Sequence, residues 1–217
     1  MTNARARRAR REPRIRVVAI GGSADGFRSL TQILEALPPD FPAAVVITQH
    51  RRRGRVSVLA RLLSRYCELP VKEAAKNEPL RPSVVYLAPP DHLLRVEDHH
   101  LSVTDGPPVN FSRPSIDVTF DSVAARCGDR AIGVVLSGGG RDGAKGLRRI
   151  KDAGGVTIVQ DPAEARVSAM PRFALAAEHV DFKLPVAEIG PTLVRLVTGP
   201  AEDDDQSKPA PHEAVRA

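Results

Sequence analysis

The chain has 217 residues, of which 42% are hydrophobic and 27% are charged, and it contains 19 Pro, 16 Gly and 2 Cys. This length and composition predict one ordinary α/β domain with a buried core, and they exclude a wholly disordered chain and a disulfide-rich scaffold. No apolar run approaches the roughly 18 residues needed to cross a bilayer, and Cys67 and Cys127 form no CxxC pattern. We therefore expect no membrane insertion and no zinc site, and the reducing cytoplasm is the default location.

The net charge of +6 is concentrated at one end of the chain. Residues 1–16 contain seven Arg and one Glu, so the remainder is neutral overall. We predict that residues 1–14 are a disordered Arg-rich arm, residues 15–200 a folded domain, and residues 201–217 an acidic disordered tail. The arm is either a solvated extension, which is the simpler interpretation, or a contact for acidic lipid, nucleic acid or an acidic partner. Because the solvated extension is favoured, no nucleic-acid partner is expected for the protein.

Within the domain, short apolar runs alternate with segments of helical periodicity. In chain order, the pattern predicts a strand at 15–20, a helix at 30–37, a strand at 43–48, a helix at 56–63 and a strand at 84–87. Two extended runs within 93–103 predict a hairpin. The remaining elements are a helix at 116–124, a strand at 131–136, a helix at 147–153, a strand at 156–159 and a helix around 193–197.

Strands separated by helix-length crossovers indicate a doubly wound, mainly parallel sheet with helices on both faces, here with a small β-hairpin insertion. Ligands of such sheets bind at the carboxyl ends of the strands. The ends of the strands at 15–20, 43–48 and 131–136 carry Ser23, His50 and Asp142, respectively. We therefore expect these three side chains to converge.

A Ser, a His and an Asp that meet provide a nucleophile, a base to take its proton, and a carboxylate to orient the base. Gly21 and Gly22 precede the serine, and they allow a tight turn that brings backbone N–H groups beside the hydroxyl. Each residue taken alone has a structural explanation: Ser23 and Asp142 are suitable helix caps, and His50 is an ordinary loop histidine. Only their coincidence at three strand ends favours an enzyme.

Several glycine-containing motifs do not fit. The segment 21–26, Gly-Gly-Ser-Ala-Asp-Gly, lacks the middle glycine of GxGxxG and has no following Lys-Ser/Thr pair, so nucleotide binding is not indicated. The hydrolase elbow GxSxG fails because Asp25 replaces its second glycine, and the chain order Ser, His, Asp also differs from that fold. His92, His99 and His100 cluster without the spacing of a metal site, so no metal and no cofactor are expected.

Taken together, the motifs resemble the catalytic domain of CheB, the chemotaxis receptor protein-glutamate methylesterase family. The resemblance runs in family order from about residue 17 to residue 197. Its segments are Ile-Gly-Gly-Ser at 20–23, Thr-Gln-His at 48–50, Tyr-Leu-Ala-Pro-Pro at 86–90, Arg-Pro-Ser-Ile-Asp at 113–117, the glycine-rich 136–144, Gln-Asp at 160–161 and Met-Pro-Arg at 170–172.

The resemblance implies that Ser23 is the nucleophile, His50 the base and Asp142 the orienting acid of a methylesterase acting on methyl-accepting chemoreceptors or related signalling proteins, with glutamine deamidation as a second activity. It also implies oxyanion or substrate contacts at Ala24, Gly139 and Met170. Ala24 and Gly139 stand where the family usually has Thr and Met.

Two other differences from the family carry expectations. An arginine loop, Arg51, Arg52, Arg53 and Arg55, follows the histidine, and it is either a solvated loop or an attraction site for an acidic protein surface. No receiver domain precedes the first strand, so we expect regulation other than phosphorylation within this chain. A noncatalytic or repurposed interaction module in a signalling system is the alternative function.

Overall fold

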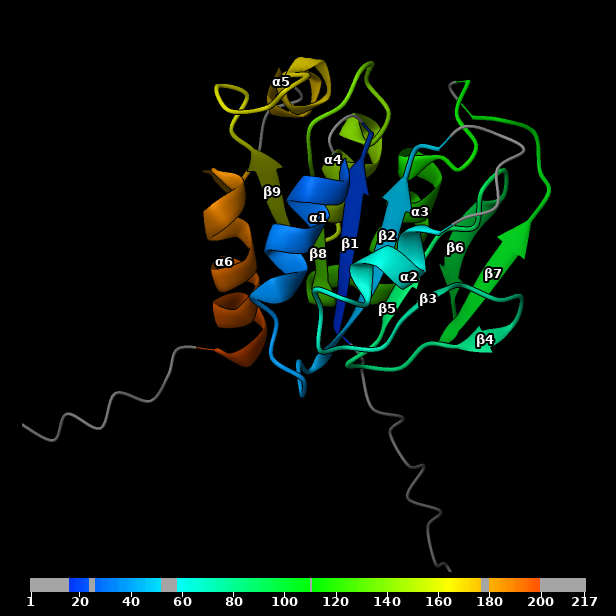
Figure 1. Ribbon diagram of the computed structural model, residues 1–217. Helices are drawn as coiled ribbons and strands as arrows, with labels where there is room; N and C mark the ends of the chain where they lie inside the picture. Colours follow the sequence, from blue (N-terminus) through cyan, green and yellow to red (C-terminus); the bar gives the residue numbers. More distant parts are fainter. Residues whose placement is uncertain (1–15, 24–25, 52–57, 110, 177–179, 200–217) are drawn as a thin grey trace, which may run out of the picture.

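The computed structural model describes residues 16–23, 26–51, 58–109, 111–176 and 180–199. Its centre is a seven-stranded parallel sheet with the order β10-β9-β8-β1-β2-β5-β3 (Figure 1). The chain moves from β1 outward to one side through β2, and it later returns to the other side through β8 and β9. The predicted doubly wound α/β class is confirmed. The strands of this sheet are β1 Arg16–Gly22, β2 Ala43–Gln49, β3 Val71–Glu73, β5 Val85–Leu87, β8 Ala131–Val135, β9 Val156–Gln160 and β10 Phe182–Leu184.

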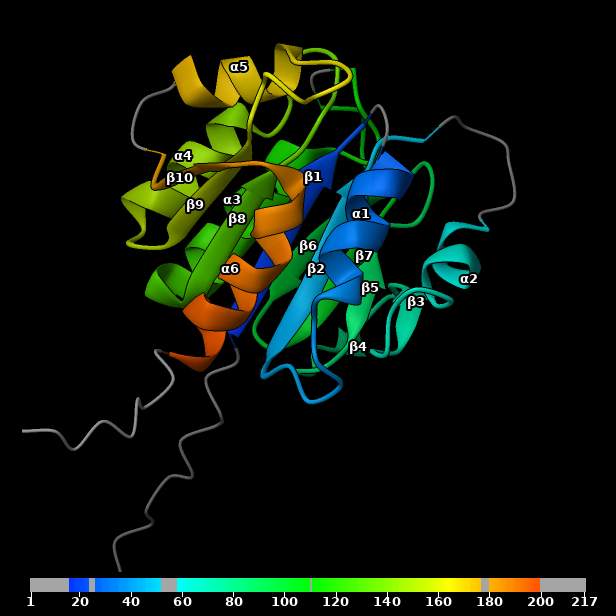
Figure 2. The ribbon, with the colours of Figure 1, turned by 60° about the vertical axis from the view of Figure 1, so that its left-hand side comes forward.

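Helices cover both faces of the sheet. In Figures 1 and 2, α1 and α6 lie on one face with α2 nearby, whereas α3 and α4 lie on the other. The helix α5 stands above the carboxyl end of β9 (Figure 1). The helices are α1 Gly26–Glu35, α2 Leu59–Leu63, α3 Ile116–Cys127, α4 Ala144–Asp152, α5 Ala169–Ala176 and α6 Val186–Thr198, with a short 3₁₀ turn at Gly128–Arg130.

The core has two halves because successive residues of a strand point to opposite faces of the sheet. On β1, Val17 and Ala19 pack into the half that contains α3 and α4. Val18 and Ile20 pack into the half that contains α1 and α6. All four side chains are fully buried. The nearly continuous apolar run of this strand, with no polar alternation, therefore reflects a strand covered on both sides.

The predicted hairpin is part of a second, antiparallel sheet of order β4-β7-β6. It consists of β6 Leu93–Glu97 and β7 His100–Thr104, joined by a turn in which His99 has φ 71°, and β4 Glu78–Pro79. The sequence pattern missed β4 and the two edge strands β3 and β10. Each has only two or three residues, which is too short for a period to emerge.

The helix predicted at 56–63 is shorter than expected. It begins at Leu59, and Val58 is 44% exposed instead of facing inward. Leu63 is the buried residue of this helix. Val56 lies outside the described residues, as do the predicted arm 1–14 and tail 201–217. None of the described helices has the length and apolar character to cross a membrane.

Candidate active site

Ser23 and His50 follow the ends of two adjacent central strands. The register of β1 and β2 pairs Gly22 with Gln49, so the next residue on each strand is Ser23 and His50, respectively. The backbone N–H of His50 donates to the carbonyl of Gly22 over 3.0 Å, which continues the ladder to this point. Neighbouring strands lie about 4.8 Å apart. The serine and the histidine are therefore next to each other at the carboxyl edge of the sheet.

On its other side, Ser23 contacts the loop that follows β8. The backbone N–H of Ser23 donates to the carbonyl of Ser137 over 3.0 Å. A Cβ atom placed on Gly138 would lie 2.9 Å from the Cβ of Ser23 and 2.7 Å from the methyl group of Met170. This position therefore requires glycine, because the serine approaches the backbone directly. The gap between β1 and β8 is also where the strand order reverses, which is the usual binding position in doubly wound folds.

The His50 ring forms a hydrogen bond with Asp142. Its Nε2 lies 2.8 Å from Oδ2 of Asp142, a carboxylate that is only 4% exposed. Because an ionised carboxylate only accepts hydrogen bonds, Nε2 carries the proton in this pair and Nδ1 keeps its lone pair. The histidine is thereby set in the tautomer whose Nδ1 is able to accept a proton.

The amino end of α3 holds Asp142 in place. Oδ2 accepts from the N–H of Ile116 over 2.9 Å, whereas Oδ1 accepts from the N–H of Asp117 over 2.9 Å and from the hydroxyl of Ser115 over 3.1 Å. Burial raises the pKa of Asp142, but the hydrogen bond from His50 and those from the two N–H groups outweigh burial, so the pKa lies below its ordinary value. A helix amino terminus favours an anion for the same reason.

Asp117 makes the reciprocal contact with the amino end of α4. Its Oδ1 accepts from the N–H of Gly143 over 2.9 Å and from that of Gly146 over 2.8 Å. Gly143 has φ 97°, a conformation that glycine adopts without steric cost. Burial raises the pKa of Asp117, the Gly146 N–H lowers it, and the nearby Asp142 raises it again, for a net rise. Asp142 thus caps α3, the helix that contains Asp117. Asp117 in turn caps α4, the helix that begins two residues after Asp142.

The segment 113–117 belongs to the family resemblance, but its motif does not indicate this role. The signal was present: Ser115 precedes an apolar helical pattern, and serine is a preferred helix cap. Its hydroxyl accepts from Val118 N–H over 3.5 Å. The sequence pattern does not show which carboxylate the amino end of α3 binds.

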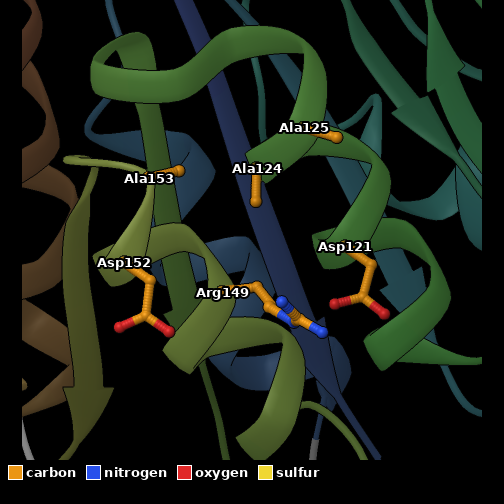
Figure 3. Close-up of a pocket in the computed structure, with 6 residues that line it drawn as sticks. All are labelled: Asp121, Ala124, Ala125, Arg149, Asp152 and Ala153. Carbon is orange, nitrogen blue, oxygen red and sulfur yellow. The ribbon is translucent and has the colours of Figure 1, made fainter.

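His50 and Asp142 open onto a cavity of about 310 Å³. Its other lining residues are Phe111, Ser112, Gly139, Gly140 and Arg141. A larger hollow of about 490 Å³ lies between the C-terminal halves of α3 and α4, where Arg149 is directed toward Asp121 (Figure 3). Burial raises the pKa of Asp121, and Arg149 opposes that rise. The larger hollow has no nucleophile or histidine among its lining residues, whereas the smaller one has His50.

The backbone amides near the serine differ in availability. The N–H of Ser23 is engaged by Ser137, and the N–H of Gly138 donates to Val167 over 2.9 Å. Gly139 is exposed at the cavity, and its N–H makes no hydrogen bond with the described residues. Of the candidate oxyanion groups, Gly139 is therefore the one with an available donor, and Ala24 lies outside the described residues.

Met170, expected as an oxyanion or substrate contact, is fully buried. Its sulfur and methyl group lie against the backbone of Gly138, so it supports the glycine loop from the interior. Phe173, on the outer side of the same helix, is half exposed. Asp161, from the Gln-Asp segment of the resemblance, pairs with Lys183 over 3.2 Å and accepts a hydrogen bond from the N–H of Ala163.

Arg51, for which a solvated loop and an acidic protein surface were the two alternatives, is bound within the protein. Its guanidinium donates to Glu73 over 3.1 Å and also to the carbonyl of Ala88, and its side chain is only 14% exposed. Arg51 thus connects the segment after β2 to the end of β3 and to the residue that follows β5. Arg52, Arg53 and Arg55 lie outside the described residues. No group of three or more metal-ligating side chains occurs in the described part of the chain.

Comparisons with known proteins agree on one family. A family model described as CheB methylesterase matches residues 18–193. A protein-glutamate methylesterase/protein-glutamine glutaminase of Moorella thermoacetica is 44% identical over 195 residues, which cover 87% of this chain and 46% of that protein. A putative enzyme of the same name from Leptospira interrogans is 41% identical over 180 residues, covering 82% of this chain and 93% of that protein.

A solved structure gives the same result. The catalytic domain of the Thermotoga maritima CheB methylesterase superposes with a TM-score of 0.79 at 35% identity, covering 84% of this chain and 99% of that one. The chain spans about half the length of the Moorella relative but nearly all of the Leptospira relative.

Proposed function

Because the chain belongs to the CheB methylesterase family, we propose that it hydrolyses glutamyl methyl esters on a chemoreceptor-like protein, with Ser23 as nucleophile, His50 as base and Asp142 as the orienting carboxylate. The observation that carries this proposal is the 2.8 Å contact between His50 Nε2 and Asp142, which leaves Nδ1 as the nitrogen able to accept a proton. The register of β1 and β2 supports it, because it makes Ser23 and His50 neighbours. The relatives are named for the same activity.

In the first half of the reaction, His50 Nδ1 takes the proton of the Ser23 hydroxyl as its oxygen attacks the ester carbonyl. The tetrahedral oxyanion accepts a hydrogen bond from the N–H of Gly139, a type of contact worth about 3 to 4 kcal/mol in comparable sites. Collapse of this intermediate breaks the bond to methoxide, which leaves as methanol with the proton from His50. The product is an acyl-enzyme in which the glutamyl carbonyl is joined to Ser23.

In the second half, His50 takes a proton from water as the water oxygen attacks the acyl carbon. The bond to Ser23 then breaks, the serine recovers its proton, and the glutamate carboxylate is released. The same sequence applied to a glutamine side chain releases ammonia instead of methanol. The names of the relatives include this glutaminase activity, which favours it as a second reaction at the same site.

The Ser23 hydroxyl makes no hydrogen bond to the His50 ring within the described part of the chain. Catalytic hydrogen bonds of free enzymes are commonly long and shorten in the substrate complex. The proposal therefore includes a side-chain rotation of Ser23 toward Nδ1 when the ester is bound. We place the reaction in the reducing cytoplasm, with which the unpaired Cys67 and Cys127 are compatible.

Covalent trapping tests the proposal. A serine-directed phosphonate should label Ser23 in the native protein, and mass spectrometry of the digested product locates the label. Ser23→Ala and His50→Ala should both abolish labelling and the release of methanol from methylated receptors, while circular dichroism shows that each variant is folded. The absence of both labelling and methanol release in the folded native protein would instead favour a noncatalytic interaction module.

A further inference from the structure

Phe111 projects from the rim of the cavity in an unusual way. Its side chain is 102% exposed, although Phe41 and Phe120 are fully buried in the core. It sits in a tight turn closed by two backbone hydrogen bonds between Val109 and Ser112, of 2.9 and 3.0 Å. Its φ of 64° places it in the left-handed region, which is uncommon for a bulky residue. A fully exposed ring buries no apolar surface in the core.

Arg141 is a second unusual residue of the same cavity. It immediately precedes Asp142 in the glycine-rich loop, and its side chain is exposed. Its guanidinium makes no ion pair or hydrogen bond with the described residues. By contrast, Arg51 and Arg113, which also lie near this edge, are bound to Glu73 and Asp91, respectively. Arg141 is thus a cation beside the catalytic groups with capacity for an external anion.

We propose that Phe111 and Arg141 are specificity-determining residues that bind an acidic protein helix on either side of the target ester, with Phe111 contacting an apolar side chain and Arg141 a neighbouring carboxylate. This inference rests on the proposed function. Residues three and four apart on a helix are neighbours on its surface, so one helix face presents an ester, a carboxylate and an apolar group together. The two residues line the same cavity as His50 and Asp142, so they meet whatever surrounds the reacting side chain.

The physical argument for a protein substrate is the cost of an exposed aromatic ring. Exposed rings in strained turns persist where they have a function, and aromatic residues and Arg are the side chains that contribute most to recognition surfaces. A small ester needs neither contact, because it enters the cavity without covering the rim. Phe111 and Arg141 should therefore separate a receptor helix from a small ester.

The experiment measures two reactions with each variant: methanol release from a methylated receptor fragment, and hydrolysis of p-nitrophenyl acetate as a reference for the chemistry itself. For Phe111→Asn and for Arg141→Glu, we expect kcat/KM on the receptor relative to that on the small ester to fall about tenfold, mainly through KM. The fall for Arg141→Glu should shrink as salt is raised, because salt screens the charge, whereas that for Phe111→Asn should not.

Matched variants separate recognition from folding. Phe111→Asn removes the ring but suits the left-handed backbone, so its melting temperature should equal or exceed that of the native protein. Phe111→Tyr keeps the ring and should retain the native kcat/KM on the receptor. Arg81→Glu makes the same charge change at an exposed position before β5, at the opposite edge of the sheet, and should leave the receptor reaction unchanged.

The outcomes are distinguishable from failure of the proposed function. If the native protein demethylates the receptor and both variants keep the native ratio of the two reactions, Phe111 and Arg141 do not recognise the substrate. A drop in melting temperature for Phe111→Asn would assign Phe111 to folding and also overturn the inference. If the native protein hydrolyses neither substrate and Ser23 is not labelled, the proposed function itself fails, and this inference falls with it.

Discussion

Replacement of Asp142 by Asn tests the orienting carboxylate while almost preserving its shape. Oδ1 of Asp142 accepts from Ser115 and Asp117, and Oδ2 accepts from His50 and Ile116. An Asn nitrogen at the Oδ2 position would face two N–H donors. At the Oδ1 position it would face the N–H of Asp117 and a Ser115 hydroxyl that is able to turn and accept. The second orientation is therefore favoured, and it leaves one buried N–H without a partner.

The structure sets the size of both expected effects. A buried donor left unpaired costs about 1 to 3 kcal/mol, so Asp142→Asn should lower the free energy of unfolding by that amount. The larger effect is on the rate. At the 2.8 Å separation of His50 and Asp142, a unit charge pair at an effective dielectric constant of about 20 interacts by roughly 6 kcal/mol. The Asn dipole retains part of this interaction, so we expect kcat to fall by about 10³ to 10⁴.

The assay compares kcat for methanol release with urea unfolding monitored by circular dichroism, so that loss of folded protein is separated from loss of rate. A kcat within tenfold of the native value, in a variant that is folded, would show that the charge of Asp142 does not stabilise the protonated His50. A rise in the free energy of unfolding of Asp142→Asn at neutral pH would also contradict this role, because it would mean that the native site binds the carboxylate unfavourably. Ser115→Ala is the matched control, since it removes one neutral donor and should change kcat far less than the loss of the charge.

Three further outcomes are expected. Gly138→Ala should reduce kcat at least tenfold and destabilise the fold by about 1 to 3 kcal/mol, because its Cβ would lie 2.9 Å from that of Ser23, whereas Gly139→Ala, with nothing within 4 Å, should keep the native melting temperature. The pKa of Asp117 is raised by burial, so the folded state binds more protons than the unfolded state just above pH 3.8. The free energy of unfolding therefore falls as the pH rises through this range, and Asp117→Asn should remove this pH dependence in urea titrations. Arg51→Ala should lower the melting temperature through loss of its buried contacts but should leave KM for an acidic receptor nearly unchanged, and a KM increase without a stability loss would contradict its structural role.

The fold and the location of the chemistry were readable from local pattern. Continuous apolar runs such as 43–48 predicted buried parallel strands, and the predicted ends lie within two residues of the observed ones. Since the carboxyl ends of parallel strands share one edge, Ser23, His50 and Asp142 could be expected at that edge before any coordinate was known. The prediction of the strands and the prediction of their common edge depend on periodicity and chain direction, which are properties of short segments.

The local sequence pattern did not reveal the burial or the hydrogen-bond partners of the side chains at this edge. Met170 was expected as an oxyanion or substrate contact and is buried under Gly138. Arg51 belongs to a loop expected either in solvent or against an acidic protein surface, and it is bound to Glu73. The support of Asp142 by the amino end of α3 was likewise not foreseen.

The amino-acid sequence by itself thus determined the alternation of the central strands with helices, the edge at which three chemical groups gather, and the family resemblance of its motifs. Only the tertiary structure decided that the N–H of Gly139 is available, that Nε2 of His50 is the nitrogen bound to Asp142, and that Phe111 and Arg141 border the cavity. The reason is physical: helix and strand periods arise between near neighbours along the chain, whereas hydrogen-bond partners and exposure depend on segments tens of residues apart that meet only when the sheet and its two helical layers pack together.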